Sequence, residues 1–338
     1  MSELAETVLR YPRLWKTMQD AKVFEGQTPT PASTKAQSQY NMRSAMDIHP
    51  KVGKWISRKA IKQNPVGKLL PSDLPSTRFV DAGEVDAAVA GIRRDGFYVF
   101  AHTAPTEVVE SLRSFAEQAP SIARGAGTAP APYPRNNPAV GRYDIDEEPA
   151  LASAEVQEFA TDPLMGLIAQ KYLGQPVLMD EVAFWWTTNK RAEDANVNAQ
   201  LFHQDRDRLS FLKFFIYLTD VTPDTGPHVY LKGSHLGVPR SLRGDGRKTD
   251  EAVRAAGLWD NVTEICGPAG TLMAVDTIGL HKGKTPISGD RLALENEFAT
   301  SLFGTDYVVP FFSPTALTAQ RVSDFSWIFQ RYSSAVKA

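Results

Sequence analysis

The residue types of a metal site occur in two short stretches that lie far apart in the sequence. His203 and Asp205 are separated by a single residue, and His281 lies well downstream. In an extended backbone, side chains at positions i and i+2 point to the same side, so His203 and Asp205 would face one site. A second imidazole completes a 2-His-1-carboxylate set, which suits a non-haem Fe(II) ion and leaves positions open for other ligands. We therefore predict that His203, Asp205 and His281 bind the metal and form the catalytic centre.

Arg291 follows the distal histidine at the beginning of an expected strand. Its planar guanidinium group can donate two parallel hydrogen bonds to a carboxylate. Iron oxygenases of this kind usually need an organic cosubstrate with a carboxylate to anchor, and we expect Arg291 to bind it. The alternative for Arg291 is an ion pair at the protein surface.

The other histidines are weaker candidates, because a histidine at an arbitrary position is most often a surface residue or a hydrogen-bonded core residue. His235 follows a Gly-Ser pair in an expected loop and is the main competitor of His281 for the third ligand position. We interpret the remaining three as structural: His49, His102 and His228.

The strand expected at residues 209–219 has two different faces. One face is apolar throughout, and the other mixes polar and aromatic side chains: Lys213, Phe215, Tyr217 and Thr219. This pattern suits the wall of a barrel, whose apolar side packs on helices while the mixed side lines a cavity. If Arg291 points into the barrel, Glu295 and Glu297 of the same strand do so too. Carboxylates buried there need a cationic partner, for which Lys213 and a cationic group of the substrate are the candidates.

Further contacts of the site are predicted from sequence position. Thr285, shortly after His281, and Lys213, on the inner strand face, are expected to help bind the cosubstrate. Around the substrate we expect four residues: Tyr217, Trp186, Arg206 and Glu295. Trp185 and Trp186 are neighbours in a strand, so one faces inward and the other outward. For Asp207 we favour an exposed acid paired with Arg206 or Arg208 over a role in orienting an imidazole.

Expected helices come first in the chain and strands afterwards. Apolar residues recur at helical spacing within residues 81–119, around a short strand at 97–100, and again at 162–173, where Gly174 ends the helix. Later strands are expected at 177–179, 182–188, 209–219, 267–277 and 291–302. This order indicates an α+β protein with a largely antiparallel sheet. The Pro- and Gly-rich segment 120–149 and the polar segment 241–256, which shows no buried face, are our candidates for a lid.

Composition indicates a soluble globular protein that binds neither nucleic acid nor membranes. The chain has 338 residues, of which 42% are hydrophobic and 22% charged, and its net charge of −2 gives no general attraction to polyanions. One cysteine, Cys266, and an N-terminus without signal-peptide features predict a cytoplasmic location, and no apolar run is long enough for a membrane span. Residues 1–78 would form an N-terminal extension that packs on the core or at an interface, and residues 79–338 the catalytic domain. The oligomeric state stays open, with a homodimer as one option.

Together these motifs resemble the phytanoyl-CoA dioxygenase family of Fe(II)/2-oxoglutarate-dependent oxygenases. The likeness also includes segment 95–100, the strand and turn at 218–226, the Gly-Ser-His loop at 233–235 and the strand at 270–281. It implies a double-stranded β-helix (jelly-roll) core that uses Fe(II), 2-oxoglutarate and O2, with Arg291 on the far carboxylate of 2-oxoglutarate. The family more often has a hydroxyl residue two positions after the distal histidine, where this chain has Gly283.

The resemblance implies an enzyme that hydroxylates an unactivated C–H bond of a small molecule, such as a biosynthetic intermediate, and releases succinate and CO2. The same site can support desaturation, epimerisation or cyclisation. Two alternatives come from other classes. A non-catalytic jelly-roll binding module would have lost a metal ligand, and a Zn or Mn cupin-type enzyme without 2-oxoglutarate would leave Arg291 unexplained.

Overall fold

The computed structural model describes residues 12–27, 34–48, 51–61, 67–190, 200–244 and 246–332. In these residues, ten strands form two antiparallel sheets. The larger sheet has the order β1-β8-β5-β10-β4-β3-β2, and the smaller sheet the order β7-β6-β9. The strands are β1 (Phe97–Val99), β2 (Ile122–Ala123), β3 (Arg142–Ile145), β4 (Leu178–Thr187), β5 (Phe211–Tyr217), β6 (His228–Leu231), β7 (Val262–Ile265), β8 (Leu272–Val275), β9 (His281–Gly283) and β10 (Arg291–Ala299).

Alternation along the central strands gives the larger sheet an apolar outer face and a mixed inner face. Leu212, Phe214 and Ile216 of β5 are fully buried in the main apolar core. Lys213 and Phe215 point the other way and line a cavity, as period-2 alternation predicts. Two antiparallel sheets with a cavity between them make a double-stranded β-helix, so the predicted α+β jelly-roll fold is confirmed.

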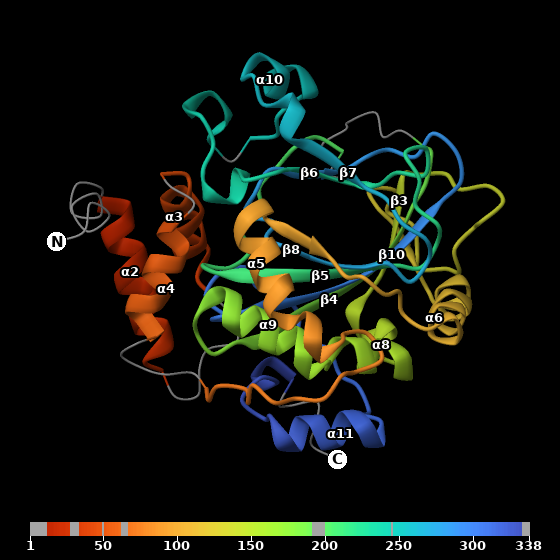
Figure 1. The fold of residues 1–338 in the computed structure, drawn as a ribbon, viewed down its shortest axis with the longest axis horizontal. Coiled ribbons are helices and arrows are strands. Elements are labelled where there is room, and N and C mark those ends of the chain that lie inside the picture. Colours follow the sequence, from red (N-terminus) through yellow and green to blue (C-terminus); the bar gives the residue numbers. More distant parts are fainter. Residues whose placement is uncertain are drawn as a thin grey trace.

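Helices cover the outer face of the larger sheet (Figure 1). α5 and α9 lie against it, α8 lies beside α9 with Ala160 accepting a hydrogen bond from Asn296 of β10 (2.9 Å), and α11 packs on α8 in a further layer. α9 begins at Asp162, whose carboxylate accepts hydrogen bonds from the following turn, and ends at Gly174 in the left-handed conformation, as predicted. The helices are α2 (Pro12–Glu25), α3 (Ala36–Met46), α4 (Lys51–Ile61), α5 (Val85–Asp95), α6 (Thr106–Gln118), α7 (Glu147–Ala150), α8 (Ala154–Ala160), α9 (Pro163–Leu173), α10 (Asp250–Ala255) and α11 (Ala316–Asp324).

The N-terminal helices α2, α3 and α4 form a separate layer at one end of the larger sheet, on the left of Figure 1. Their buried apolar side chains, among them Leu14 and Ile56, share a second core with Phe211 at the start of β5. Arg206 also joins the two layers, because it pairs with Asp47 at the end of α3. The described helices α2, α3 and α4 therefore pack on the end of the larger sheet.

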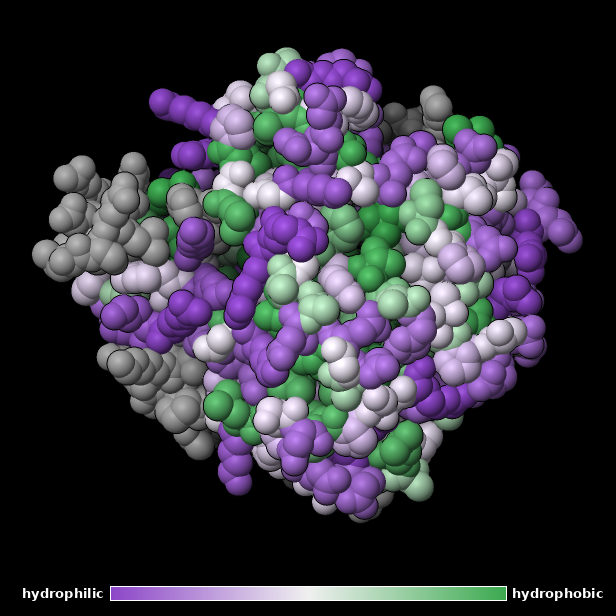
Figure 2. Space-filling view, in the orientation of Figure 1, coloured by the Kyte–Doolittle hydropathy of each residue, from purple (hydrophilic) through white to green (hydrophobic). Residues whose placement is uncertain are grey.

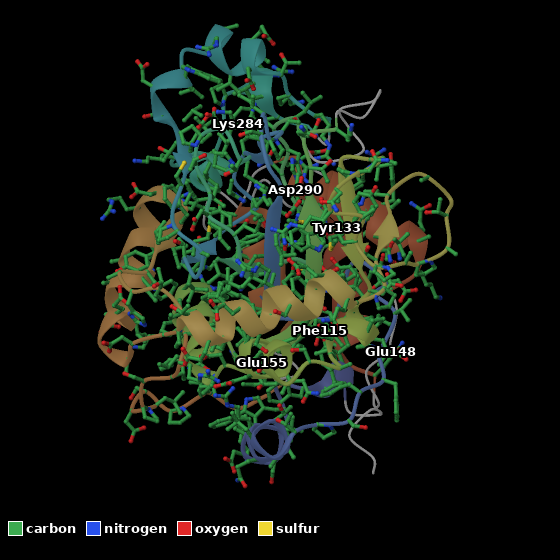
Figure 3. All side chains as sticks on the ribbon, turned by 90° about the vertical axis from the view of Figure 1, so that its right-hand side faces the viewer. Phe115, Tyr133, Glu148, Glu155, Lys284 and Asp290 are labelled. Carbon is green, nitrogen blue, oxygen red and sulfur yellow. The ribbon has the colours of Figure 1, made fainter. Side chains whose placement is uncertain are left out.

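The two segments expected as lids are parts of the packed structure. Within residues 120–149, β2 and β3 extend the edge of the larger sheet, and the Tyr133 hydroxyl donates to Asp290 just before β10; the two residues lie close together in Figure 3. Within residues 241–256, Leu242 and Val253 are fully buried in an apolar cluster. The expectation that this second segment has no buried face is therefore wrong, because a helix as short as α10 needs too few apolar residues to produce a visible period.

The face of the molecule in Figure 2 is mainly hydrophilic, with apolar residues in small separate groups. The exposed large apolar side chains come from many different elements, such as Trp15 in α2, Ile287 before β10 and Leu317 in α11. Scattered apolar side chains of this kind are usual on globular proteins. Within the described ranges, no helix has the length and apolar character to cross a membrane.

Candidate active site

The two ligand stretches meet through backbone hydrogen bonds. The N–H of His203 donates to the carbonyl oxygen of His281 (2.9 Å), and the N–H of His281 donates back to His203 (3.0 Å). The N–H of Asp205 donates to Thr277 (2.9 Å), on the loop that leads to β9. These bonds hold the His-x-Asp stretch beside the distal histidine and bring the predicted ligands to one point.

Three donor atoms converge at this point. The Nε2 atoms of His203 and His281 each lie 3.6 Å from a carboxylate oxygen of Asp205. The Nδ1 atoms lie 2.9 Å from the carbonyl oxygens of Leu201 and Gly279, so each Nδ1 carries the proton and donates it. The Nε2 lone pairs are therefore left for a metal ion. Donor atoms of all three residues lie within 4.8 Å of one another.

Burial and close charges keep these side chains in their metal-binding forms. Burial, with a smaller contribution from His281, lowers the pKa of His203 to about 3, so its imidazole is neutral at pH 7. Burial alone would raise the pKa of Asp205, but Lys213 and the two histidines bring it well below its ordinary value. A neutral imidazole and an ionised carboxylate are the forms that bind a metal.

Arg291 is buried on the inner face of β10. One guanidinium nitrogen donates to the carbonyl oxygen of Gly226 and another to the hydroxyl of Thr187 (3.2 Å), while Nε is buried without a hydrogen-bond partner. A Cβ atom added at Gly283 would lie 3.3 Å from Nη2 of Arg291. A larger residue at position 283 would therefore crowd the guanidinium group. Because Arg291 is buried, the alternative of an ion pair at the protein surface is wrong.

A cavity of about 340 Å³ lies between the sheets at the three converging side chains. Its lining alternates along β4, with Glu181, Ala183, Trp185 and Thr187 facing inward. β4 and β10 are antiparallel, with Thr187 opposite Arg291 and Ala183 opposite Glu295. The acidic residues of both strands, Glu181 in β4 and Glu295 in β10, therefore lie at one end of the cavity, and Arg291 lies at the other. We call the first of these the acidic end. The cavity is lined by Arg124, Arg142, Glu181, Ala183, Trp185, Thr187, His203, Asp205, Asp207, Lys213, Phe215, His228, Arg247, His281, Gly283, Arg291 and Glu295.

Lys213 is the centre of a group of carboxylates at the acidic end. Its Nζ lies 2.9 Å from Glu295, 3.3 Å from Glu297, 3.4 Å from Asp205 and 3.6 Å from Asp207. Burial alone would lower the pKa of Lys213, but the carboxylates raise it well above its ordinary value. This ammonium group is occupied by protein carboxylates, which favours its predicted role as their partner over its predicted role in cosubstrate binding.

Trp186, expected at the substrate, lies on the outer face of β4. Its ring stacks on Tyr133 (centroids 4.4 Å apart), and its Nε1 donates to Ala116 (3.3 Å). The inward-facing residue is Trp185, which lines the cavity. Alternation required one of the pair to face inward, but the register of β4 against β10 decides which one.

Three further residues predicted at the site lie outside the cavity lining. The Tyr217 hydroxyl is hydrogen-bonded to backbone groups of β6 and β7 (2.9 Å each), so it ties the sheets together outside the cavity lining. Arg206 is turned to Asp47, and Thr285 lies outside the lining. Of the residues predicted around the substrate, Glu295 lines the cavity.

Asp207 and His228 both line the cavity, contrary to expectation. Asp207 faces Lys213, and Arg208 is held by a different carboxylate. His228 stacks on the ring of His281, with centroids 5.3 Å apart and an interplanar angle of 4°. Burial lowers the pKa of His228 well below its ordinary value, and its Nε2 has no hydrogen-bond partner. No local motif marks His228, because the pairing of β6 with β9 places it.

The remaining histidines are apart from this group. His235 places Nε2 3.2 Å from the carbonyl oxygen of Arg93, and His102 lies beside Glu84. In the described ranges, the histidine-containing group with metal-ligand spacing consists of His203, Asp205 and His281, and a second group consists of Glu181, Glu295 and Glu297. His49 lies outside the described residues.

Comparison with known proteins agrees with this geometry. Residues 92–291, more than half of the chain, match the family model described as phytanoyl-CoA dioxygenase (PhyH). The chain belongs to this family. As a PhyH-family member it is a 2-oxoglutarate-dependent oxygenase that uses Fe(II), 2-oxoglutarate and O2, which confirms the predicted enzyme class and cofactors. Among curated proteins no match was found.

Solved structures resemble the PhyH-family chain more weakly. The epimerase SnoN, in complex with Fe3+, alpha ketoglutarate and nogalamycin RO, is 17% identical over 68% of this chain and 89% of its own, with a TM-score of 0.48. HygX from Streptomyces hygroscopicus, with nickel and 2-oxoglutarate bound, is 19% identical over 64% and 88%, with a TM-score of 0.47. EctD from S. alaskensis, with bound Fe, is 17% identical over 69% and 80%, with a TM-score of 0.46. Since these TM-scores are below 0.5, the sheet topology and the family match carry the assignment.

Proposed function

We propose that this PhyH-family chain hydroxylates an unactivated C–H bond of a small molecule, with His203, Asp205 and His281 as the ligands of Fe(II). The observation that carries the proposal is the convergence of two Nε2 atoms on one carboxylate at the wall of a cavity. Succinate and CO2 are the coproducts from 2-oxoglutarate. Desaturation, epimerisation and cyclisation are further outcomes of the same site.

The donor set fits Fe(II). Two neutral imidazoles and one carboxylate on one face leave coordination positions open for other ligands. The carbonyl oxygens of Leu201 and Gly279 fix both imidazoles in the required tautomer. Bound here, Fe(II) supplies the redox chemistry with O2 and 2-oxoglutarate, while the protein supplies binding and orientation.

Arg291 would bind the far carboxylate of 2-oxoglutarate. Its side chain is buried and lines the same cavity as the three predicted metal ligands. Within the described part of the chain, no carboxylate forms an ion pair with it. Burial lowers the pKa of Arg291, but a guanidinium group keeps its charge at any physiological pH. A buried cation that lacks a protein anion is costly unless a ligand supplies one. The contacts to Gly226 and Thr187 hold the group in place for that ligand.

We further propose that residues 1–78 are a structural cover of the catalytic domain, residues 79–338, and that the enzyme acts on its small molecule in the cytoplasm. The described helices of the cover share a core with β5 and contribute no side chain to the cavity lining. Cys266 is an exposed free thiol, which suits a reducing compartment.

The test is made on anaerobic apoprotein. Addition of Fe(II) and 2-oxoglutarate should produce the weak visible charge-transfer band of the chelate, and His281→Ala should abolish it. Arg291→Ala should keep the band but need about 100-fold more 2-oxoglutarate, because it removes charge-assisted hydrogen bonds worth about 3 kcal/mol. Titration of the band measures both effects.

Arg94→Ala is the matched control, because Arg94 is an exposed arginine of α5 that pairs with Asp95. Its titration should match that of the wild type. Absence of a band in the wild type, together with tight binding of Zn, would defeat the oxygenase assignment and favour the cupin-type alternative.

A further inference from the structure

The acidic end of the cavity holds more carboxylates than cations. Glu181, Asp207 and Glu295 line the cavity there. Glu297 is fully buried and lies beside Lys213, which also pairs with Glu295. In the described part of the chain, the ion pairs of Asp207, Glu295 and Glu297 all go to this one ammonium group. Glu181 forms no ion pair within the same ranges, although its carboxylate lies within 4.8 Å of Glu295 and Glu297.

Three neighbouring arginines are held by carboxylates outside this group. Arg124 and Arg142 both bind Asp144, at 2.7 to 2.9 Å. Arg208, behind the wall, binds Asp180 with two hydrogen bonds. A divalent metal ion at Asp205 would be balanced by that carboxylate together with the carboxylate of 2-oxoglutarate that binds it. In the described part of the chain, Asp207, Glu295 and Glu297 thus form their ion pairs with Lys213. Arg247 also lines the cavity and acts on His203, and Arg43 acts on Asp207 from outside the lining.

Buried carboxylates in this number are costly unless a cation joins them. Burial raises the pKa of Glu181 to about 8, so without a cation it holds a proton at pH 7. A protonated carboxyl at the wall of a cavity can ionise when a cationic ligand binds beside it. The site is thus prepared to receive positive charge.

Trp185 adds a second, independent requirement. Its side chain is 6% exposed, lines the same cavity, and has an Nε1–H with no hydrogen-bond partner. The guanidinium group of Arg142 covers its ring at 4.3 Å from the centroid, so the indole is fixed in place. A buried N–H donor of this kind calls for an acceptor on a ligand.

We propose that the substrate carries a protonated amine, which binds at Glu181 and Glu295, and a hydrogen-bond acceptor, which faces Trp185. This inference rests on the proposed function, because it assigns the substrate of the same cavity. A volume of about 340 Å³ that also admits 2-oxoglutarate leaves room for a small group, on the scale of an amino acid or an amino alcohol.

A second divalent metal ion is the competing occupant of Glu181, Glu295 and Glu297. It would have to lie close to the ammonium group of Lys213, which is 2.9 Å from Glu295 and 3.3 Å from Glu297. Repulsion between that ammonium group and a divalent ion disfavours the metal. A monovalent ammonium group beside Glu181, the carboxylate without an ion pair, avoids most of this repulsion.

The test compares two probes of equal length, 4-amino-1-butanol and 1,4-butanediol, on anaerobic holoenzyme loaded with Fe(II) and 2-oxoglutarate at fixed ionic strength. The thermal unfolding midpoint should rise by about 2 °C with the amine at ten times its dissociation constant, and not with the diol. Glu181→Gln should remove most of this shift, because it deletes the unpaired carboxylate. The exposed Glu110 of α6 provides the matched control Glu110→Gln, which should keep the shift.

Equal shifts with the diol and the amine, an amine shift that persists in Glu181→Gln, or no amine shift up to tens of millimolar would each overturn the amine proposal. A shift with Mg²⁺ that needs Glu181, without an amine shift, would overturn it in favour of a metal. The charge-transfer band recorded in the same samples distinguishes failure of the amine proposal from failure of the proposed oxygenase function. An intact band with a negative amine result leaves the oxygenase function standing, and a missing band refutes that function whatever the probes do.

Discussion

Single atoms without a partner define the chemistry of this site. The backbone carbonyls of Leu201 and Gly279 accept hydrogen bonds from the Nδ1–H groups of His203 and His281 and leave both Nε2 lone pairs for a metal ion. Nε of Arg291 and Nε2 of His228 are buried and unpaired in the same cavity. Because buried polar atoms are nearly always hydrogen-bonded in folded proteins, such atoms indicate where a ligand makes contact.

His228→Phe tests whether the unpaired imidazole serves 2-oxoglutarate. A phenyl ring keeps the stacking on His281 but removes the unpaired nitrogen, so the stability of the apoprotein should stay the same or rise by about 1 kcal/mol. The concentration of 2-oxoglutarate needed for the charge-transfer band should increase about 10-fold, since a hydrogen bond worth about 1.4 kcal/mol is lost. Thermal unfolding and band titration measure the two effects. Lower stability with an unchanged titration would instead mean that His228 is purely structural.

At the scale of elements, one strand pairing decides which side chains meet. β10 pairs with β4 and with β5, and this places Glu295 opposite Ala183 and Phe215 on one inner face. A shift by one residue would turn Trp185 outward and Trp186 inward. The helix α2 is fixed to the end of the same strand, because its last residue, Glu25, accepts a hydrogen bond from the Ser301 hydroxyl.

Glu25→Gln tests how α2 is attached. Burial raises the pKa of Glu25 to about 7 from an ordinary value of 4.5, so the unfolded chain releases this proton at lower pH than the folded protein does. The wild type should therefore lose stability as pH rises from about 4.5 to about 7, by up to about 1.4 kcal/mol per pH unit. The glutamine keeps an acceptor for Ser301 and has no such loss, so its advantage should appear in this window. Denaturant unfolding at pH 4.5 and pH 7.5 measures it, and equal pH dependence in both proteins would contradict it.

For the whole molecule, two separate apolar cores stabilise the fold. The main core lies between the larger sheet and α5 and α9, and the second core joins α2, α3 and α4 to the end of the sheet. The cavity lies on the other side of the sheet from the main core. We therefore expect stability and cofactor binding to be separable in variants of the second core.

Ile56→Ala should lower the free energy of unfolding by about 2–5 kcal/mol, because Ile56 is fully buried between α4 and the sheet and the substitution leaves a cavity. Binding of Fe(II) and 2-oxoglutarate should be unchanged at temperatures where the variant is folded. Denaturant unfolding and band titration test the two statements. Ile287→Ala, at a residue that is 68% exposed, is the control and should change neither.

The sequence by itself predicted the three residues that converge in the cavity, His203, Asp205 and His281, because their types and spacing are local properties that few other sites need. The jelly-roll fold followed from the resemblance of the motifs to the PhyH family, which the family match confirms. Alternation in β5 also predicted which face lines the cavity, since the period of a strand is a local property. Only the tertiary structure decided that Trp185 faces inward, that His228 joins the site and that Arg206 turns to Asp47. Those outcomes depend on strand register and on contacts between residues distant in sequence, which no local pattern specifies.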